Sequence, residues 1–146
     1  MAASAWSIFN MAKEYIGDGT IDLDTDNFRI TLHTSAAGLS AAAANLTSYG
    51  SVGNEVTEAN GYSSSGKQLS AVTWATGASA GERRFDCTAV VWTASGGTIP
   101  AVRYAVIWAS GGNLLAWAEL STSPFAITDG NTLTITPSAN GIFELN

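Results

Sequence analysis

The sequence predicts an all-β domain, a jelly-roll or β-sandwich of about eight short antiparallel strands preceded by one short helix. From residue 69 onward, short apolar or alternating runs follow one another, and Gly with Asn or Asp marks most of the boundaries between them. The length of 146 residues suits one domain with a single core, so we expect residues 1–146 to form one β-sandwich domain.

The N-terminal segment shows helical periodicity. Trp6, Phe9, Ala12 and Ile16 recur at spacings of three and four residues, which predicts a helix over about residues 5–16. We expect the side that carries Trp6 and Phe9 to dock on a sheet or on a neighbouring subunit.

The first strand follows an acidic turn. The run NFRITLHT places Phe28, Ile30 and Leu32 on one side and polar residues on the other, which is strand alternation. Residues 35–68 hold small and turn-forming residues, so a long irregular connection is expected there, with one helical turn near residues 41–44. The remaining expected strands are LSAVTWAT, ERRFDCTAVVW, VRYAVIWA, LLAWAEL, PFAIT, NTLTITP and GIFEL.

The hairpin RYAVIWASGGNLLAWAEL, residues 103–120, is apolar on both faces. Tyr104 and Trp108 share one face, whereas Ile107 lies on the other. We expect the Tyr104 face to meet an opposing sheet, and the Ile107 face to be covered by the N-terminal helix, a second copy or another protein. The residues predicted at interfaces are Trp6, Phe9, Ile107, Trp108, Leu115 and Trp117.

Composition favours assembly over nucleic-acid binding. Charged residues make up only 12% of the chain, and the formal net charge is −6. A largely neutral surface repels other copies weakly, and no basic cluster is present to follow a phosphate backbone. The sequence contains no stretch of about 18 consecutive apolar residues, the length that would predict a membrane span. A single cysteine, Cys87, excludes an intrachain disulfide and fits synthesis in a reducing cytosol.

Two short motifs resemble catalytic or metal sites. GASAG at residues 77–81 has the spacing of a nucleophile elbow centred on Ser79, but strand residues follow it where that elbow needs a helix, so we interpret it as a turn. The only histidine, His33, precedes this serine in the chain, although the usual order of such a triad places the histidine last. No cysteine or second histidine accompanies it to form a catalytic pair.

The acidic turn DLDTDN brings Asp22, Asp24 and Asp26 together, as at the start of a calcium loop. The sixth position is Asn27 rather than Gly, and the twelfth is His33 rather than Glu. We therefore predict a solvated acidic turn, keep the three aspartates only as weak metal candidates, and expect no cofactor.

The tryptophans leave a glycan-binding alternative open. Trp108 and Trp117 flank the hairpin, and aromatic faces bind sugar rings through apolar contact. Asp86 and Glu119 would act together in glycoside hydrolysis only if the fold placed them at a suitable separation.

Four stretches carry a family resemblance: AKEYIGDGTIDLDTDNFRITLHTSA, NEVTEANGYSSSGKQLSAVTW, ASAGERRFDCTAVVWTASGG and TDGNTLTITPSANGIFEL. Together they resemble a family of small virion proteins of tailed bacteriophages. The resemblance implies a structural protein without enzymatic activity, and it supplies no catalytic or metal-binding residues.

Within that resemblance we favour a capsid cement or decoration protein. Its expected partners are the major capsid protein and further copies of itself, as a homodimer or homotrimer. Its expected location is the outer capsid surface of the virion, after synthesis in the host cytoplasm. The alternatives are a tail, neck or fibre-associated component and a carbohydrate-binding module for host attachment.

Overall fold

The computed structural model describes residues 5–40 and 45–146, and it confirms a mostly β architecture. The described chain forms twelve short strands, more than the eight or so expected, and all their pairings are antiparallel. The largest sheet has five strands, in the order β1 (Ser7–Ile8), β9 (Leu114–Glu119), β8 (Tyr104–Ala109), β2 (Phe28–His33) and β3 (Lys67–Gln68).

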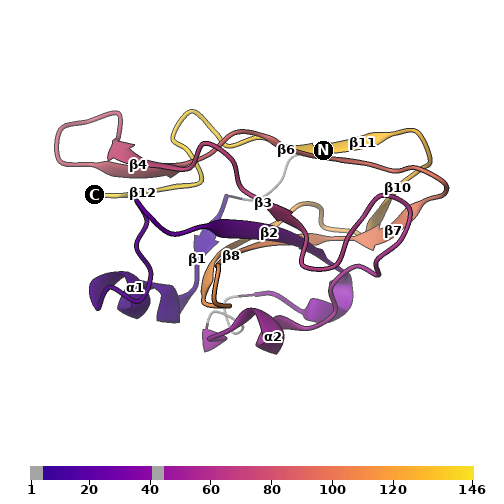
Figure 1. The fold of residues 1–146 in the computed structure, drawn as a ribbon, viewed down its shortest axis with the longest axis horizontal. Coiled ribbons are helices and arrows are strands. Elements are labelled where there is room, and N and C mark those ends of the chain that lie inside the picture. The colour runs from indigo at the N-terminus through magenta and orange to yellow at the C-terminus, as the bar shows by residue number, and fades with distance from the viewer. Residues whose placement is uncertain (1–4, 41–44) are drawn as a thin grey trace.

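Three smaller sheets complete the strand layers. One orders β12 (Phe143–Leu145), β5 (Arg83–Asp86) and β4 (Thr73–Thr76). The others pair β11 (Thr132–Ile135) with β6 (Val90–Thr93), and β10 (Phe125–Ile127) with β7 (Ile99–Val102). Figure 1 shows β4, β6, β11 and β12 in one layer above β2, β3 and β8, with the helices on the far side of the five-stranded sheet.

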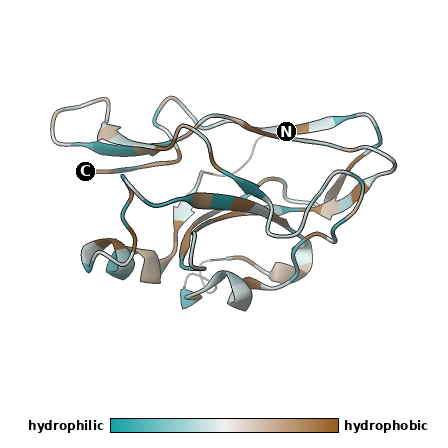
Figure 2. Ribbon diagram, in the orientation of Figure 1, coloured by the Kyte–Doolittle hydropathy of each residue, from teal (hydrophilic) through white to brown (hydrophobic). Residues whose placement is uncertain are grey.

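One face of the five-stranded sheet packs against the smaller sheets. β2 alternates hydrophobic and hydrophilic residues along its length (Figure 2), and β8 lies opposite it with Phe28 beside Ala109 and Ile30 beside Ile107. Phe28 meets Phe85 of β5 edge to face, with the ring centroids 4.9 Å apart. The Ile107 face therefore meets the opposing layer.

The other face is covered by the long connection, which reverses the predicted arrangement of the hairpin. The ring of Tyr49 stacks on Trp108 at 4.4 Å between centroids. The Arg29 guanidinium donates to the carbonyl oxygens of Ser65 and Gly66 at 2.8 and 3.0 Å. Tyr104 and Trp108 therefore face the irregular connection and the helices, because the connection supplies the aromatic and polar groups that this face needs.

The N-terminal helix is shorter than predicted. Helix α1 spans Asn10–Gly17, and the preceding residues are extended as β1, which pairs with β9. The Phe9 backbone N–H donates to the carbonyl oxygen of Leu115 at 3.1 Å, so sheet pairing takes the residues that periodicity assigned to the first helical turn. The helical spacing of the apolar residues therefore arose from burial in two successive elements, the strand β1 and the helix α1.

The connection at residues 35–68 is largely irregular, as predicted. It contains the short helices η1 (Ser35–Ala37) and α2 (Tyr49–Val52), and it ends in β3. The helical turn expected at residues 41–44 lies outside the described residues. Gly66 has a φ of +60°, and a Cβ there would lie 1.9 Å from the Ile30 carbonyl oxygen, so glycine permits the close approach to β2.

Two strand boundaries differ from the predictions. The run ERRFDCTAVVW divides into β5 and β6, which belong to different sheets. Strand β7 contains Pro100 and precedes the expected start of the hairpin. Among the described residues, no helix is both long enough and apolar enough to span a membrane.

The contact between layers predicts a large loss of stability in Phe85→Ala. Phe85 is fully buried and packs against both Phe28 and Phe143. We expect the substitution to lower the free energy of unfolding by about 3–5 kcal/mol, measured by urea denaturation. The control Val91→Ala, at a side chain that is 41% exposed, should change it by less than about 1 kcal/mol. Equal effects of the two substitutions would contradict this account of the core.

Candidate interaction surface

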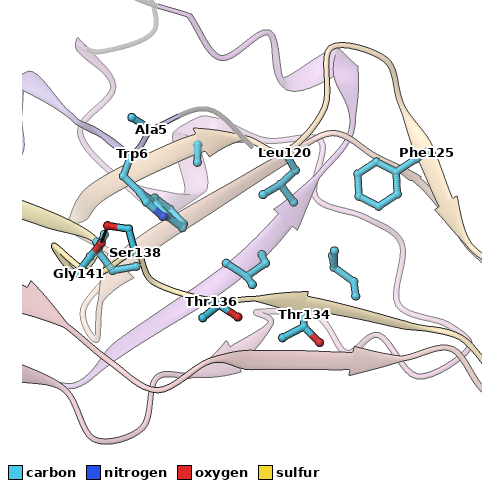
Figure 3. A pocket seen from close by; sticks show the side chains of 12 residues that line it. Ala5, Trp6, Leu120, Phe125, Thr134, Thr136, Ser138 and Gly141 are labelled. Carbon is cyan, nitrogen blue, oxygen red and sulfur yellow. Dashed lines mark hydrogen bonds between the residues drawn. The ribbon is translucent and has the colours of Figure 1, made fainter. Parts of the chain in front are cut away.

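An apolar trough opens between the two layers beside β1 and β9. Its volume is about 500 Å³. We call it the interlayer trough, and its apolar lining comprises Trp6, Leu120, Phe125, Leu133, Ile135 and Ile142. Figure 3 shows Trp6, Leu120 and Phe125 across the opening from Thr134 and Thr136. The described residues therefore leave a hollow between the layers along this side.

Local structure explains why Trp6 points into the trough. Ile8 lies opposite Ala116 on the face that meets the second layer, and side chains two residues apart in an extended segment share a face. Trp6 therefore points between the layers and leaves the helix face that periodicity predicted for it. Ala118, which shares this face with Ala116, and Leu120, which follows β9, also line the trough.

Strand edges form the walls of the trough. Four consecutive residues, 133–136, line it, although successive side chains of a strand point to opposite faces. Such a run can line one hollow only if the edge of the strand faces it. β11 pairs with β6 alone, so this edge carries main-chain groups that no strand of the described chain pairs.

A second hollow of about 550 Å³ continues the trough and shares Trp6, Ser138, Gly141 and Ile142 with it. Residues 5–8 and 140–144 line this hollow as consecutive runs, so the edges of β1 and β12 face it. Lys13 of α1 and Glu144 of β12 place one charge of each sign here. The combined surface offers the edges of β11 and β12, which no strand of the described chain pairs, above an apolar floor, and this arrangement suits an added β-strand.

A buried polar cluster fixes the long connection to the opposite face of the five-stranded sheet. His33 is fully buried, and its Nδ1 lies 2.8 Å from the Gly53 carbonyl oxygen. Because that oxygen only accepts, Nδ1 carries the proton, and Nε2 accepts from the Thr31 hydroxyl at 2.9 Å. Burial lowers the pKa of His33, an effect that the Gly53 carbonyl and the charge of Glu55 partly offset.

Glu55 is the acceptor at the centre of this cluster. Its carboxylate accepts hydrogen bonds from the hydroxyls of Tyr49 and Tyr62, the latter at 2.6 Å. The Tyr62 oxygen also accepts from the Leu32 backbone N–H at 3.0 Å. Burial, reinforced by Glu55, raises the pKa of Tyr49 to about 12 and raises the pKa of Tyr62 further. Both phenols therefore remain donors at neutral pH, and the cluster holds the connection in place.

The structure buries four of the six predicted interface residues within the subunit. Phe9, Ile107 and Leu115 have no exposed surface, and Trp108 is 8% exposed. Their side chains are thus part of the core and are unavailable to a partner. Trp6 and Trp117 are half-buried, and only Trp6 lines the trough. Trp117 lies on the opposite face, where its ring meets Tyr104 edge to face at 6.4 Å.

The three aspartates form a closed turn. Asp22 accepts from the backbone N–H groups of Asp24 and Thr25, and Asp26 accepts from the N–H of Asp22. Hydrogen bonds to Asp24 and Thr25 lower the pKa of the Asp22 carboxyl. No group of three or more His, Cys, Asp or Glu side chains within residues 5–40 and 45–146 is arranged to hold a metal ion. The carboxylates thus stabilise the turn before β2.

The other suspected chemical groups do not converge. Ser79 lies in the turn between β4 and β5, where its backbone N–H donates to Glu82. Burial raises the pKa of the Cys87 thiol to about 11, so little thiolate is present at neutral pH. Asp86 belongs to β5, whereas Glu119 belongs to β9 and binds Arg103 at 2.7 Å. The two carboxylates lie on different sheets.

Several trough residues escaped the sequence analysis. The alternation in TLTIT indicates that Leu133 and Ile135 point inward, but it does not indicate that the strand beside them is missing. Leu120, Phe125 and Ile142 flank turns, where an apolar residue has no periodic pattern to mark it.

No family model matches the chain, and no match was found among the curated proteins or the solved structures.

The Glu55 cluster predicts a specific cost for Tyr62→Phe. The substitution keeps the ring but leaves the Leu32 N–H without its acceptor and the half-buried carboxylate of Glu55 with one donor fewer. We expect the free energy of unfolding to fall by about 1–3 kcal/mol in urea denaturation. Tyr15→Phe is a matched control at a half-buried tyrosine outside this cluster, and a loss as large in the control would contradict the assignment.

His33 predicts a loss of stability in mild acid. Its pKa in the folded protein lies below the ordinary value of 6.5, so the unfolded chain binds more protons below that pH. The contribution of neutral His33 to the free energy of unfolding is complete above pH 6.5. It decreases as the pH falls through 6.5 toward the pKa of the folded state, with a slope of at most about 1.4 kcal/mol per pH unit.

The measurement is the free energy of unfolding between about pH 5 and pH 7.5, a window that brackets the ordinary histidine pKa. His33→Asn is the comparison, because its amide NH₂ can replace Nδ1–H as the donor to Gly53 but does not titrate. The native protein should lose more stability than the variant across this window. Parallel curves would exclude His33 as the titrating group.

Proposed function

We propose that this chain is a structural protein of a tailed-bacteriophage virion and, more specifically, a capsid cement or decoration protein. The resemblance of its sequence to small virion proteins supports the class. The observation that carries the proposal is the interlayer trough, where an apolar floor lies beside the edge of β11, which among the described strands pairs with β6 alone, on a chain with only 12% charged residues. Such a surface suits a protein that binds other proteins.

The proposal includes a finer assignment of the fold. We assign the two strand layers to a sandwich of the jelly-roll kind, supported by the antiparallel pairing and by the Phe28–Phe85 contact between layers. Such a framework holds the trough rigid, because both of its walls belong to hydrogen-bonded sheets.

In the proposed mechanism the protein acts by bridging. One small subunit contacts several subunits of the major capsid protein on the outer surface, and copies associate as dimers or trimers. Each contact is modest, but linked contacts dissociate together, so their combined strength exceeds that of any one contact. This role is not enzymatic and requires no cofactor. Synthesis in the host cytoplasm precedes addition to the capsid.

The stoichiometry of the chain in purified particles tests this function. Quantitative mass spectrometry against the major capsid protein should give a ratio of one, or a simple fraction such as a half or a third. A few copies per particle would instead assign the protein to the tail, neck or a fibre. Complete absence from particles would overturn the virion proposal, and glycan binding would then be tested directly with Trp117→Ala.

A further inference from the structure

Residues 45–66 form a distinct unit of the long connection, which we call the strap. The strap lies on the second face of the five-stranded sheet, where Tyr49 stacks on Trp108. Three of its apolar side chains are buried, those of Val52, Val56 and Tyr62, whereas every residue of β8 is buried. Segments with few buried apolar side chains open at a lower free energy than core strands. We therefore expect the strap to open more readily than β8.

The strap is joined within itself at Glu55. The Glu55 carboxylate accepts hydrogen bonds from Tyr49, near the start of the strap, and from Tyr62, near its end. A second internal bond joins the backbone N–H of Ser64 to the carboxylate of Glu58 at 2.8 Å. Because these bonds connect the two ends of the segment, we expect the strap to open as one cooperative unit.

The imidazole of His33 joins the strap to the sheet. The ring is fully buried; its Nδ1–H donates to the Gly53 carbonyl of the strap, and its Nε2 accepts from the Thr31 hydroxyl of β2. Beside this contact the Val56 N–H donates to the Leu32 carbonyl oxygen at 2.9 Å. The neutral ring thus completes hydrogen bonds on both sides of the contact.

Protonation of His33 disturbs this arrangement while the strap is closed. Nε2 then carries a proton, so the Thr31 hydroxyl must accept it and direct its own proton to the Val106 carbonyl oxygen, which lies 3.4 Å away. A long hydrogen bond replaces a good one, and the buried ring gains a charge. The closed strap therefore favours the neutral ring.

The charged and titratable groups around His33 offset only part of this cost. The charge of Glu55 favours the imidazolium, but the effect of burial is larger. The Tyr49 ring lies 6.5 Å from the imidazole between centroids, and Tyr104 of β8 is opposite His33 in the sheet. Arg103 donates its backbone N–H to the His33 carbonyl oxygen, while its guanidinium binds a carboxylate of β9.

We propose that the strap is an acid-sensitive cover, which opens as one unit while the two layers stay folded, and that protonation of His33 favours the open state. Opening removes Tyr49 from Trp108 and exposes the aromatic second face of the sheet. The layers stay folded because their contact, between Phe28 and Phe85, lies on the opposite face. This inference does not depend on the virion role.

Hydrogen exchange measured by mass spectrometry tests the opening. Strap amides such as that of Val56 should exchange through an opening that costs less free energy, and depends less on urea, than exchange in β8. Phe85→Leu separates the two events, because Phe85 lies between the layers and keeps its contacts when the strap opens. The substitution should speed exchange in β8 by about tenfold or more and leave strap exchange unchanged. Strap amides that accelerate as much as those of β8 would overturn the proposal, since the strap would then open only with the whole chain.

The role of His33 is tested by the same exchange at about pH 7.5 and about pH 5.5, corrected for the intrinsic pH dependence of exchange. The opening constant of the strap should rise in acid, by at most about tenfold, because the lower pH is about one unit below the ordinary histidine pKa.

His33→Asn is the matched control, because it keeps a donor to Gly53 but does not titrate, and its opening constant should rise less. Circular dichroism checks that each variant is folded. A native chain whose strap opens equally at the two pH values would overturn the proposal. A folded His33→Asn variant whose opening constant rises as much as that of the native chain would do the same.

Discussion

The five-stranded sheet is buried on both faces, and the rest of the structure depends on that burial. Every residue of β8 is buried, so the sheet needs cover above and below. The smaller sheets meet one face through Phe28 and Phe85, and the long connection meets the other through Tyr49 and Trp108. A strand with two apolar faces is stable in water only when two separate parts of the chain pack against it.

The second face is covered by irregular chain, and the buried polar cluster follows from that. A connection that is neither helix nor sheet has backbone and side-chain polar groups that must be satisfied where they are buried. His33 and Tyr62 bind the Gly53 carbonyl, the Leu32 N–H and Glu55. The cluster has the residue types of an active site, yet each hydrogen bond described for it either joins the connection to the sheet or lies within one of the two. Its titration therefore alters stability.

The same architecture leaves one side of the layers open. The layer that covers β8 consists of two- and three-stranded sheets. β11 is an outer strand of one of these sheets, and it lies above the edge of the five-stranded sheet at β1. Trp6 then lies on the floor of a trough instead of in a closed core. The proposed virion role depends on this opening, because a partner's strand could add to the layer beside β11, which pairs with β6 alone among the described strands.

Much of this was predictable from the sequence, because alternation and turn residues are local signals. They predicted the all-β class, the strand alternation of β2, the hairpin of β8 and β9 and the irregular connection. They also showed that both faces of the hairpin need cover. Only the tertiary structure determined which segment covers which face, since burial leaves the same apolar pattern whether a sheet, a loop or a partner provides it. For that reason Phe9, Ile107, Trp108 and Leu115 were predicted at interfaces and are core residues. The trough also required the structure, because an unpaired edge is a property of the neighbours that a strand lacks, and no local pattern in the strand records it.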